Sequence, residues 1–235
     1  YDSMVGTGNA GTNAPSDAAV VVAKPTRKGL ALTTDCNSRY VFADPYKGCM
    51  IAVAEAARNI VCSGGQPLGI TNCLNFGNPK KPEVFWQFKE AVAGMGEACT
   101  ALETPVTGGN VSLYNENPSG AVYPTPTIGM VGVLDDATRA MGMAFRGAGD
   151  AIILLGEPTA ELGASEYLAT VHGLVAGAPP ACDIRRERAL IDTLNACQEV
   201  NTFVPALAYT FAARPTEIVV SHEERFAGES KYSLY

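Results

Sequence analysis

The sequence has few charged residues, and it has no basic cluster. Only 17% of its 235 residues are Asp, Glu, Lys or Arg, and the net charge is −7. Proteins that bind nucleic acid or an anionic membrane surface need concentrated positive charge. Apolar stretches are short as well, and none approaches the ~20 residues that cross a bilayer. We therefore expect neither nucleic acid nor a membrane among the partners of this chain.

Histidine and patterned cysteine are also scarce. The two histidines, His172 and His222, limit any mechanism that needs a histidine base, and we interpret His172 as structural. Seven cysteines are present, but none forms a C-x-x-C pair. This spacing is typical of neither a disulfide framework nor a zinc site. We expect most of these cysteines to be small buried side chains in a reducing, cytoplasmic environment.

Hydrophobic residues, by contrast, are plentiful at 47% of the chain, and their spacing predicts strands and long helices in alternation, a pattern compatible with an α/β fold. Short β-branched and apolar runs predict strands, and apolar residues that recur every three or four positions predict helices. The predicted strands are residues 18–23, 29–34, 68–74 and 127–134, of which the first two are expected to form a hairpin. The predicted helices are residues 48–62 and 82–102.

The pattern starts again after Asp136, which predicts a domain boundary near residue 137. The second unit is expected to hold a strand at 151–155 and helices at 162–171 and 184–200. We interpret residues 1–136 as one domain and residues 137–235 as a second unit, too short to complete a core. The chain begins at Tyr1 without a start methionine, so we expect it to be a segment of a longer protein. No signal peptide pattern is found at its beginning.

The segment from Thr104 to Glu116 carries the side chains best suited to bind a ligand. Gly108 and Gly109 are expected at the tip of a turn, where glycine lets the backbone approach a ligand closely. Oxygen-bearing side chains follow them at Asn110, Ser112, Asn115 and Glu116. These groups suit a phosphate or a hard cation such as Mg²⁺. A Gly-Gly-Asn sequence is equally typical of an ordinary turn.

Other polar residues have simple structural interpretations. Asp44 is expected to cap the helix that follows it. Glu55 and Arg58, three positions apart, are expected to form a weak surface pair. Asp35, at a strand end, suits either a turn or the orientation of a cation.

Six motifs in one order carry a family resemblance. They are DCN at 35–37, IAVAEAARN at 51–59, CSG at 62–64, TNCLNFGNP at 71–79, GNVSLYNE at 109–116 and PTPTIGMVG at 124–132. Together they resemble the synthetase subunit of phosphoribosylformylglycinamidine synthase, an enzyme of de novo purine biosynthesis. The resemblance covers about residues 1–195 and is to the second of two homologous halves, each similar to aminoimidazole ribonucleotide synthetase. Residues 201–235 do not share it.

The resemblance implies a fold and an assembly. Residues 1–136 would form an α/β amino-terminal domain of the aminoimidazole ribonucleotide synthetase type. That domain would pair through its sheet, with the first half of the same enzyme or with another copy, into a two-fold or pseudo-two-fold barrel. From residue 137 an incomplete second α+β domain would follow.

The resemblance also implies a reaction. ATP would phosphorylate the formyl amide oxygen of formylglycinamide ribonucleotide, and ammonia from a glutaminase subunit or domain would displace the phosphate. Asn72 and Gly109 match positions that bind ATP, Asn110 matches a Mg²⁺ ligand and Ser112 a substrate contact. Many members of the family have Asp where this chain has Asn72, and a neutral amide adds no charge to hold a metal.

The catalytic histidine and the main nucleotide-binding lysine of the family lie in the half that this chain lacks, so the resemblance assigns no catalytic residue here. Two functions remain open at this point. The chain is part of an ATP-dependent amidine-forming ligase, inactive alone, or a non-catalytic nucleotide-binding or assembly half of the same fold.

Overall fold

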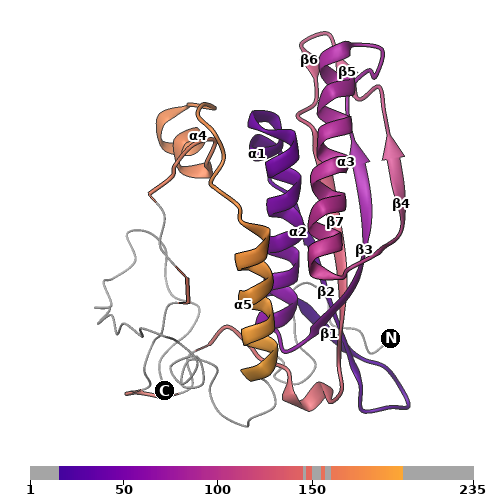
Figure 1. Cartoon of the computed structure of the whole chain (residues 1–235), viewed down its shortest axis with the longest axis vertical. Helices are drawn as coiled ribbons and strands as arrows, with labels where there is room; N and C mark the ends of the chain where they lie inside the picture. The colour runs from indigo at the N-terminus through magenta and orange to yellow at the C-terminus, as the bar shows by residue number, and fades with distance from the viewer. Residues whose placement is uncertain (1–15, 145–146, 150–154, 157–159, 198–235) are drawn as a thin grey trace.

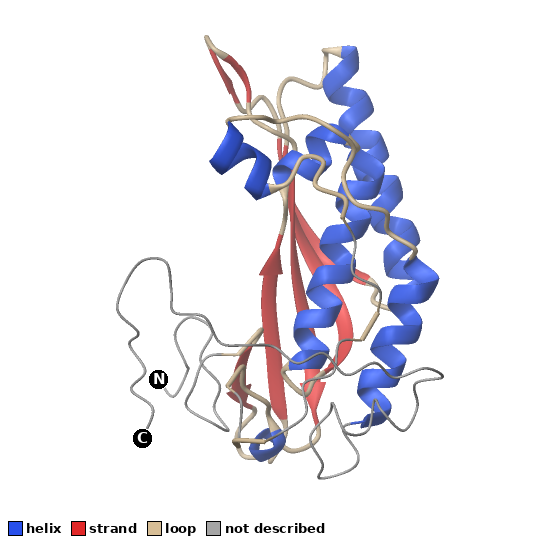
Figure 2. Cartoon of the chain, turned by 90° about the vertical axis from the view of Figure 1, so that its left-hand side faces the viewer, coloured by secondary structure: helices blue, strands red, loops and turns tan. Residues whose placement is uncertain are grey.

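A five-stranded sheet forms one layer of the molecule, and helices cover one of its two faces (Figure 1, Figure 2). The structure is a computed structural model that describes residues 16–144, 147–149, 155–156 and 160–197. In the sheet order β1-β2-β7-β3-β4, the strands are β1 (Ala19–Val22), β2 (Gly29–Asp35), β7 (Thr125–Leu134), β3 (Gln66–Asn75) and β4 (Val106–Ser112). A separate ribbon pairs β5 (Glu116–Asn117) with β6 (Gly120–Ala121).

The strand directions bring several strand ends to one edge of the sheet. The pairs β1–β2, β2–β7 and β7–β3 are antiparallel, whereas β3 and β4 are parallel. The parallel pair is possible because α3 (Pro82–Leu102) crosses over between its two strands. As a result β2, β3 and β4 end at the same edge, at Asp35, Asn75 and Ser112, and β7 begins there.

The helices build up two further layers. α2 (Pro45–Cys62) lies against β2, β7 and β3, α3 packs beside it, and α5 (Ile184–Cys197) lies against both helices. α2 begins at Pro45, because proline is tolerated in a first turn, and Asp44 caps it by accepting a hydrogen bond from the backbone N–H of Lys47 at 3.0 Å. The predicted cap is confirmed, and the helix begins three residues before the predicted residue 48.

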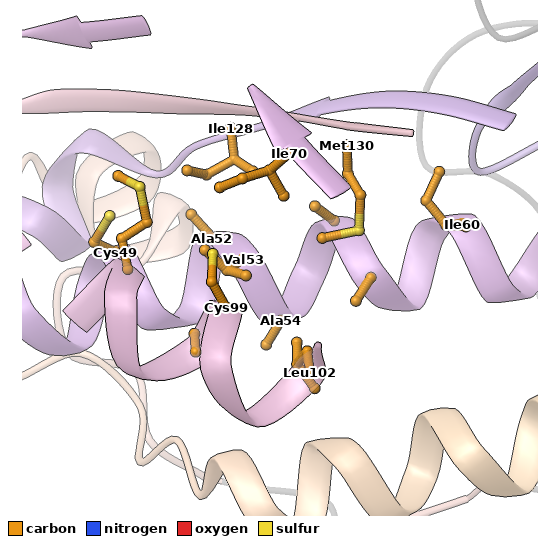
Figure 3. Packing of buried hydrophobic residues seen from close by; sticks show 14 of the residues in the cluster. Cys49, Ala52, Val53, Ala54, Ile60, Ile70, Cys99, Leu102, Ile128 and Met130 are labelled. Atoms are coloured by element: carbon orange, nitrogen blue, oxygen red, sulfur yellow. The ribbon is translucent and has the colours of Figure 1, made fainter. Parts of the chain in front are cut away.

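The core lies between α2, α3 and the sheet (Figure 3). Ile70 of β3 and Ile128 of β7 are fully buried beneath α2, and burying such a side chain stabilises the fold by about 1.5–3 kcal/mol. α2 is buried on most of its circumference, which explains its many alanines. The contact of α2 with α3 needs glycine at Gly94, since a Cβ there would lie 2.0 Å from the carbonyl oxygen of Tyr46.

The predicted α/β fold is confirmed, with differences in single elements. The four predicted strands and the helices at 48–62, 82–102 and 184–197 form, whereas the helix predicted at 162–171 begins only at Glu166, as α4 (Glu166–His172). The sequence pattern missed α1 (Ser38–Ala43) and the β5–β6 ribbon. Most of the strand predicted at 151–155 and the end of the last helix lie outside the described residues.

The turn predicted around Gly108 and Gly109 is wrong. Both glycines lie inside β4, where they pair with Thr71 and Asn72 of β3. Among the residues that the structure describes, no helix combines the length and the apolar character needed to cross a membrane.

Candidate functional site

The candidate site lies at the edge where β2, β3 and β4 end. Four residues form one row across the sheet there: Asp35, Ile128, Asn72 and Gly109, each paired with the next on the neighbouring strand. The side chains of this row point toward the helices. Asn72 donates a hydrogen bond from Nδ2 to the Met95 sulfur of α3 at 3.4 Å, and Asp35 Oδ1 accepts one from Asn59 Nδ2 of α2 at 2.7 Å.

Gly109 is a glycine because of Asn72. A Cβ at Gly109 would lie 2.1 Å from Asn72 Oδ1 and 2.6 Å from the Asn72 carbonyl oxygen. The Asn72 side chain therefore folds over Gly109 and occupies the space that any larger residue would fill. At the neighbouring Gly108 a Cβ would meet nothing within 4 Å. The sequence interpretation, in which glycine makes room for a ligand, fits Gly108 better than Gly109.

Asn110 and Ser112 lie on the other face of the sheet. Strand side chains alternate between faces, so these two residues point away from the side on which Gly109 meets Asn72. Asn110 Nδ2 is 3.9 Å from the Cys73 sulfur, and Ser112 Oγ is 3.2 Å from Asn115 Oδ1. Asn115 Nδ2 also donates to the carbonyl oxygens of Ser112 and Phe76, at 2.8 and 3.1 Å, and so fixes the loop that follows β4.

The four predicted site residues thus form two pairs. Asn72 and Gly109 contact each other on the face covered by α2 and α3, which we call the covered face. Asn110 and Ser112 lie on the opposite face, which no described helix covers and which we call the open face (Figure 2). The sheet brings all four to one edge but separates the pairs by its own thickness.

Two carboxyl groups near the covered face have raised pKa values. Burial raises the pKa of Asp35, although hydrogen bonds from Thr33 and Asn59 and the charge of Arg58 oppose the shift. The pKa of Glu55 is raised by burial and by the Asp35 charge. Arg58 makes its ion pair with Glu187 of α5, at 2.6 Å, so the predicted Glu55–Arg58 pair is not the ion pair that forms.

One charged residue at this edge, Lys81, was missed. Lys81 Nζ lies 2.9 Å from Glu116 Oε2, and this hydrogen bond lowers the pKa of Glu116. Glu116 was one of the ligand-binding candidates, but nothing in the sequence pattern indicated Lys81 as its partner, because 35 positions separate them. The bond joins the loop before α3 to β5.

The residues present do not form a metal site by themselves. Among the described residues, no group of three or more His, Cys, Asp or Glu side chains is placed to hold a metal ion. Asn110 offers one amide oxygen, whereas Mg²⁺ is usually bound by one or two carboxylates together with phosphate oxygens. Burial raises the pKa of the Cys36 thiol, next to Asp35, to about 12, which disfavours the thiolate form that binds metals.

Comparison with known proteins adds a family and a fold. Residues 15–134 match the family model described as AIR synthase related protein, N-terminal domain. The chain is 60% identical over 190 residues to "Phosphoribosylformylglycinamidine synthase subunit PurL" of Moorella thermoacetica, covering 81% of this chain and 26% of that protein. It is 56% identical over 198 residues to the protein of the same name in Chlorobium luteolum, covering 83% of this chain and 26% of the relative.

Among solved structures, the chain resembles Thermotoga maritima PurL complexed with FGAR. The identity is 25% and the TM-score 0.58, and the match covers 85% of this chain and 28% of that one. It also resembles a chain in the structure of PurLQS from Thermotoga maritima, with 32% identity and a TM-score of 0.50 over 54% of this chain and 21% of that one. The chain spans about a quarter of the length of the curated relatives it matches.

Proposed function

Because the chain belongs to the family of AIR synthase related proteins through its amino-terminal domain, we propose that it is part of an ATP-dependent ligase that converts formylglycinamide ribonucleotide to the amidine. The observation that carries this proposal is the 60% identity over 190 residues to a phosphoribosylformylglycinamidine synthase subunit. The chain spans about a quarter of that relative. We therefore propose that it contributes to the site and is inactive alone.

In this proposal the reaction has two steps. ATP phosphorylates the formyl amide oxygen, and ammonia from a glutaminase partner then displaces phosphate to form the amidine. Phosphoryl transfer depends mainly on positioning and on neutralising phosphate charge. This chain's contribution would be to hold one side of the nucleotide and the substrate. The acid–base groups would come from the part of the enzyme outside this chain.

The two pairs of residues suggest two roles. On the covered face, Asn72 and Gly109 would shape the strand ends so that backbone groups meet the nucleotide. On the open face, the Asn110 amide oxygen would join phosphate oxygens around Mg²⁺, which when bound would neutralise phosphate charge. Ser112 would contact the substrate on the same face. What supports this division is the separation of the two side-chain pairs by the sheet.

The open face also supports the proposal that this chain has a protein partner. Its half away from the strand ends is apolar and includes Leu32, which is 40% exposed, with Leu30, Val131 and Val133 on the neighbouring positions. An exposed apolar patch of this kind marks an interface. We propose that a homologous sheet covers it, either from the other half of a longer protein or from a second copy. The boundary to the following domain would lie near residue 137.

The alternative is a nucleotide-binding or assembly half with no catalytic role. One observation favours it over an independent enzyme. His172, the sole histidine among the described residues, lies on α4 with its ring 5.3 Å from that of Tyr167, on the far side of α1 from β4. It is therefore not placed as a base for chemistry at Asn110 or Ser112.

Calorimetry with ADP tests the proposed nucleotide site. We expect the full chain to bind ADP, with an affinity that Mg²⁺ strengthens, and Asn110→Ala to remove most of the strengthening by Mg²⁺. Asn117→Ala, in the β5–β6 ribbon, serves as the matched control and should leave both affinities unchanged. Equal binding of ADP by the parent and Asn110→Ala in the presence of Mg²⁺ would remove Asn110 from the site. Amidine formation by the isolated chain would contradict the proposal that it is inactive alone.

A further inference from the structure

Arg39, on α1, has a hydrogen-bond donor without an acceptor. Its side chain is 23% exposed, and its Nη2 is ion-paired with Glu166 Oε2 of α4. Its Nε is buried and has no hydrogen-bond partner among the described residues. A buried N–H that lacks an acceptor is unusual and costs free energy. The arrangement therefore calls for an acceptor near Nε.

The geometry of the guanidinium group indicates which kind of acceptor fits Nε. Nε and Nη2 lie on one edge of the planar group, the edge that binds a carboxylate or a phosphate through two parallel hydrogen bonds. Glu166 uses half of this edge. Its other oxygen, Oε1, accepts a hydrogen bond from Thr170 Oγ1 at 2.8 Å and so turns away from Nε. The Glu166 side chain is 74% exposed, which makes its carboxylate easy to displace.

The position of Arg39 is also suited to a ligand. Asp35 ends β2, and the chain enters α1 after Asn37, whose side chain accepts hydrogen bonds from the backbone N–H groups of Arg39 and Tyr40 at 3.2 Å. Arg39 therefore lies four residues after the end of β2, next to the edge where β2, β3 and β4 end. Ligands of open α/β sheets gather outside such strand ends.

A second arginine–glutamate pair shows what a purely structural pair looks like in the same fold. Arg58 of α2 and Glu187 of α5 lie 2.6 Å apart, and both side chains are largely buried, at 33% and 22% exposure. No atom of Arg58 is among the buried polar atoms that lack a partner. This pair joins two long helices and leaves no buried donor of Arg58 without an acceptor. The Arg39–Glu166 pair is half-exposed and incomplete.

We propose that the Nε–Nη2 edge of Arg39 binds a terminal phosphate group, which takes the place of Glu166 at Nη2 and supplies the missing acceptor at Nε. Glu166 then keeps its hydrogen bond with Thr170. The site is separate from the roles proposed for Asn72, Gly109, Asn110 and Ser112, and it can exist whether or not those roles are correct. A phosphate on a sugar and the end of a nucleotide diphosphate share the chemistry that this edge recognises.

Calorimetric titration of the full chain with inorganic phosphate tests the proposal. Glu166→Gln removes the competing carboxylate, so phosphate should bind about two- to fivefold more tightly, since an exposed ion pair competes weakly. Arg39→Lys keeps the charge but loses the planar edge and should weaken binding about tenfold. Arg39→Gln should abolish it. Glu187→Gln, the matched control, should leave phosphate affinity unchanged while lowering thermal stability.

Several outcomes would overturn the proposal. Phosphate affinity that is unchanged in Arg39→Gln, or not increased in Glu166→Gln, would show that the pair only joins α1 to α4. Absence of phosphate binding in both the parent and Glu166→Gln would do the same. Ribose 5-phosphate and ADP, titrated into the parent and Arg39→Gln, identify the source of the phosphate, because the true ligand should lose affinity in the variant. If neither ligand loses affinity in Arg39→Gln, the Arg39 site is absent. Loss of ADP affinity in Asn110→Ala but not in Arg39→Gln would support the proposed nucleotide site and not the Arg39 site.

Discussion

The two faces of the sheet are built from the same strands but are held together differently. On the covered face, Ile70, Ile128 and Met130 are buried by helices of this chain. On the open face, Leu32 and Val131 occupy equivalent places in the alternation, yet no described helix lies over them. The covered face therefore explains the stability of the domain. The apolar half of the open face does not contribute to that core, and we propose that a partner covers it.

The same comparison separates the candidate site residues. Asn72 and Gly109 fit each other on the covered face, so substitutions there act first on the fold. Asn110 and Ser112 lie on the open face, in the polar half next to Cys73, where substitutions can act on a ligand without disturbing the core. A test of function at this edge must therefore distinguish the two faces before it interprets a loss of binding.

The largest expected difference between the faces is in core truncation. Ile128→Ala removes a fully buried side chain beneath α2, and we expect it to lower the free energy of unfolding by about 2–5 kcal/mol. Val131→Ala, three positions along β7 on the open face, should cost less than about 1 kcal/mol in the isolated chain. Urea unfolding followed by circular dichroism gives both values. Equal costs would mean that the open face is already covered within this chain.

The second difference concerns the glycine pair in β4. Gly109→Ala would place a Cβ against Asn72 Oδ1 and should destabilise the fold by about 1–3 kcal/mol, because the Asn72 side chain and backbone must shift. Gly108→Ala faces open space and should stay within about 0.5 kcal/mol of the parent. Thermal unfolding of the two variants measures the contrast. A combined Asn72→Ala and Gly109→Ala change should recover part of the loss, and no recovery would place the strain elsewhere.

The sequence predicted the elements that depend on periodicity. The apolar stripe of α3 and the apolar run of β7 are long enough for their patterns to be unambiguous, and both elements form nearly where they were predicted. α1 was missed because six residues are too few to show a helical period, and it depends on the Asn37 cap. β4 was interpreted as a turn because paired glycines favour one, yet pairing with β3 overrides that local preference.

The candidate site was predictable as a set of residues but not as an arrangement. The motif resemblance indicated Asn72, Gly109, Asn110 and Ser112, whose roles stay predictions. That Gly109 and the pair Asn110 and Ser112 lie on opposite faces follows from the alternation within β4, which the turn interpretation hid. That Asn72 lies on the face of Gly109 follows from the register of β4 against β3, and a register cannot be obtained from one strand alone. The close fit of Gly109 with Asn72, 37 residues apart in the sequence, needed the same register, and so did the Cys73 contact of Asn110.

A charge on the open face should reduce association. Leu32→Lys places an ammonium group in the apolar half of that face, where a partner sheet would bury it without a counter-ion. We expect self-association, measured by light scattering at micromolar concentration, to weaken by about tenfold or more. The unfolding temperature at low protein concentration should change little, because Leu32 is outside the core. A parent chain that is already a monodisperse monomer at micromolar concentration would count against self-association through this face.

The smallest expected difference is in the pH dependence of stability. Asp35, on the covered face, has a pKa raised above its ordinary value of 3.8, mainly by burial. Its protonated form is favoured in the folded state, so its contribution to stability is complete below pH 3.8 and is lost as pH rises through the raised pKa. Glu116, at the surface, has a pKa lowered from 4.5 by its hydrogen bond with Lys81, so its contribution is present above pH 4.5 and is lost as pH falls through the lowered pKa.

Substitution by the neutral amide should therefore change the pH profile in opposite directions. Asp35→Asn resembles the protonated carboxyl and cannot ionise. Its stability relative to the parent should therefore increase as pH rises from about 3.5, just below the ordinary pKa of an aspartate, toward neutrality. Glu116→Gln loses the charge that Lys81 stabilises, so its relative stability should decrease over the same range. Urea unfolding at several pH values measures both differences. Parallel profiles for the two variants would show that burial on the covered face does not control Asp35, and that its hydrogen bonds with Thr33 and Asn59 outweigh desolvation.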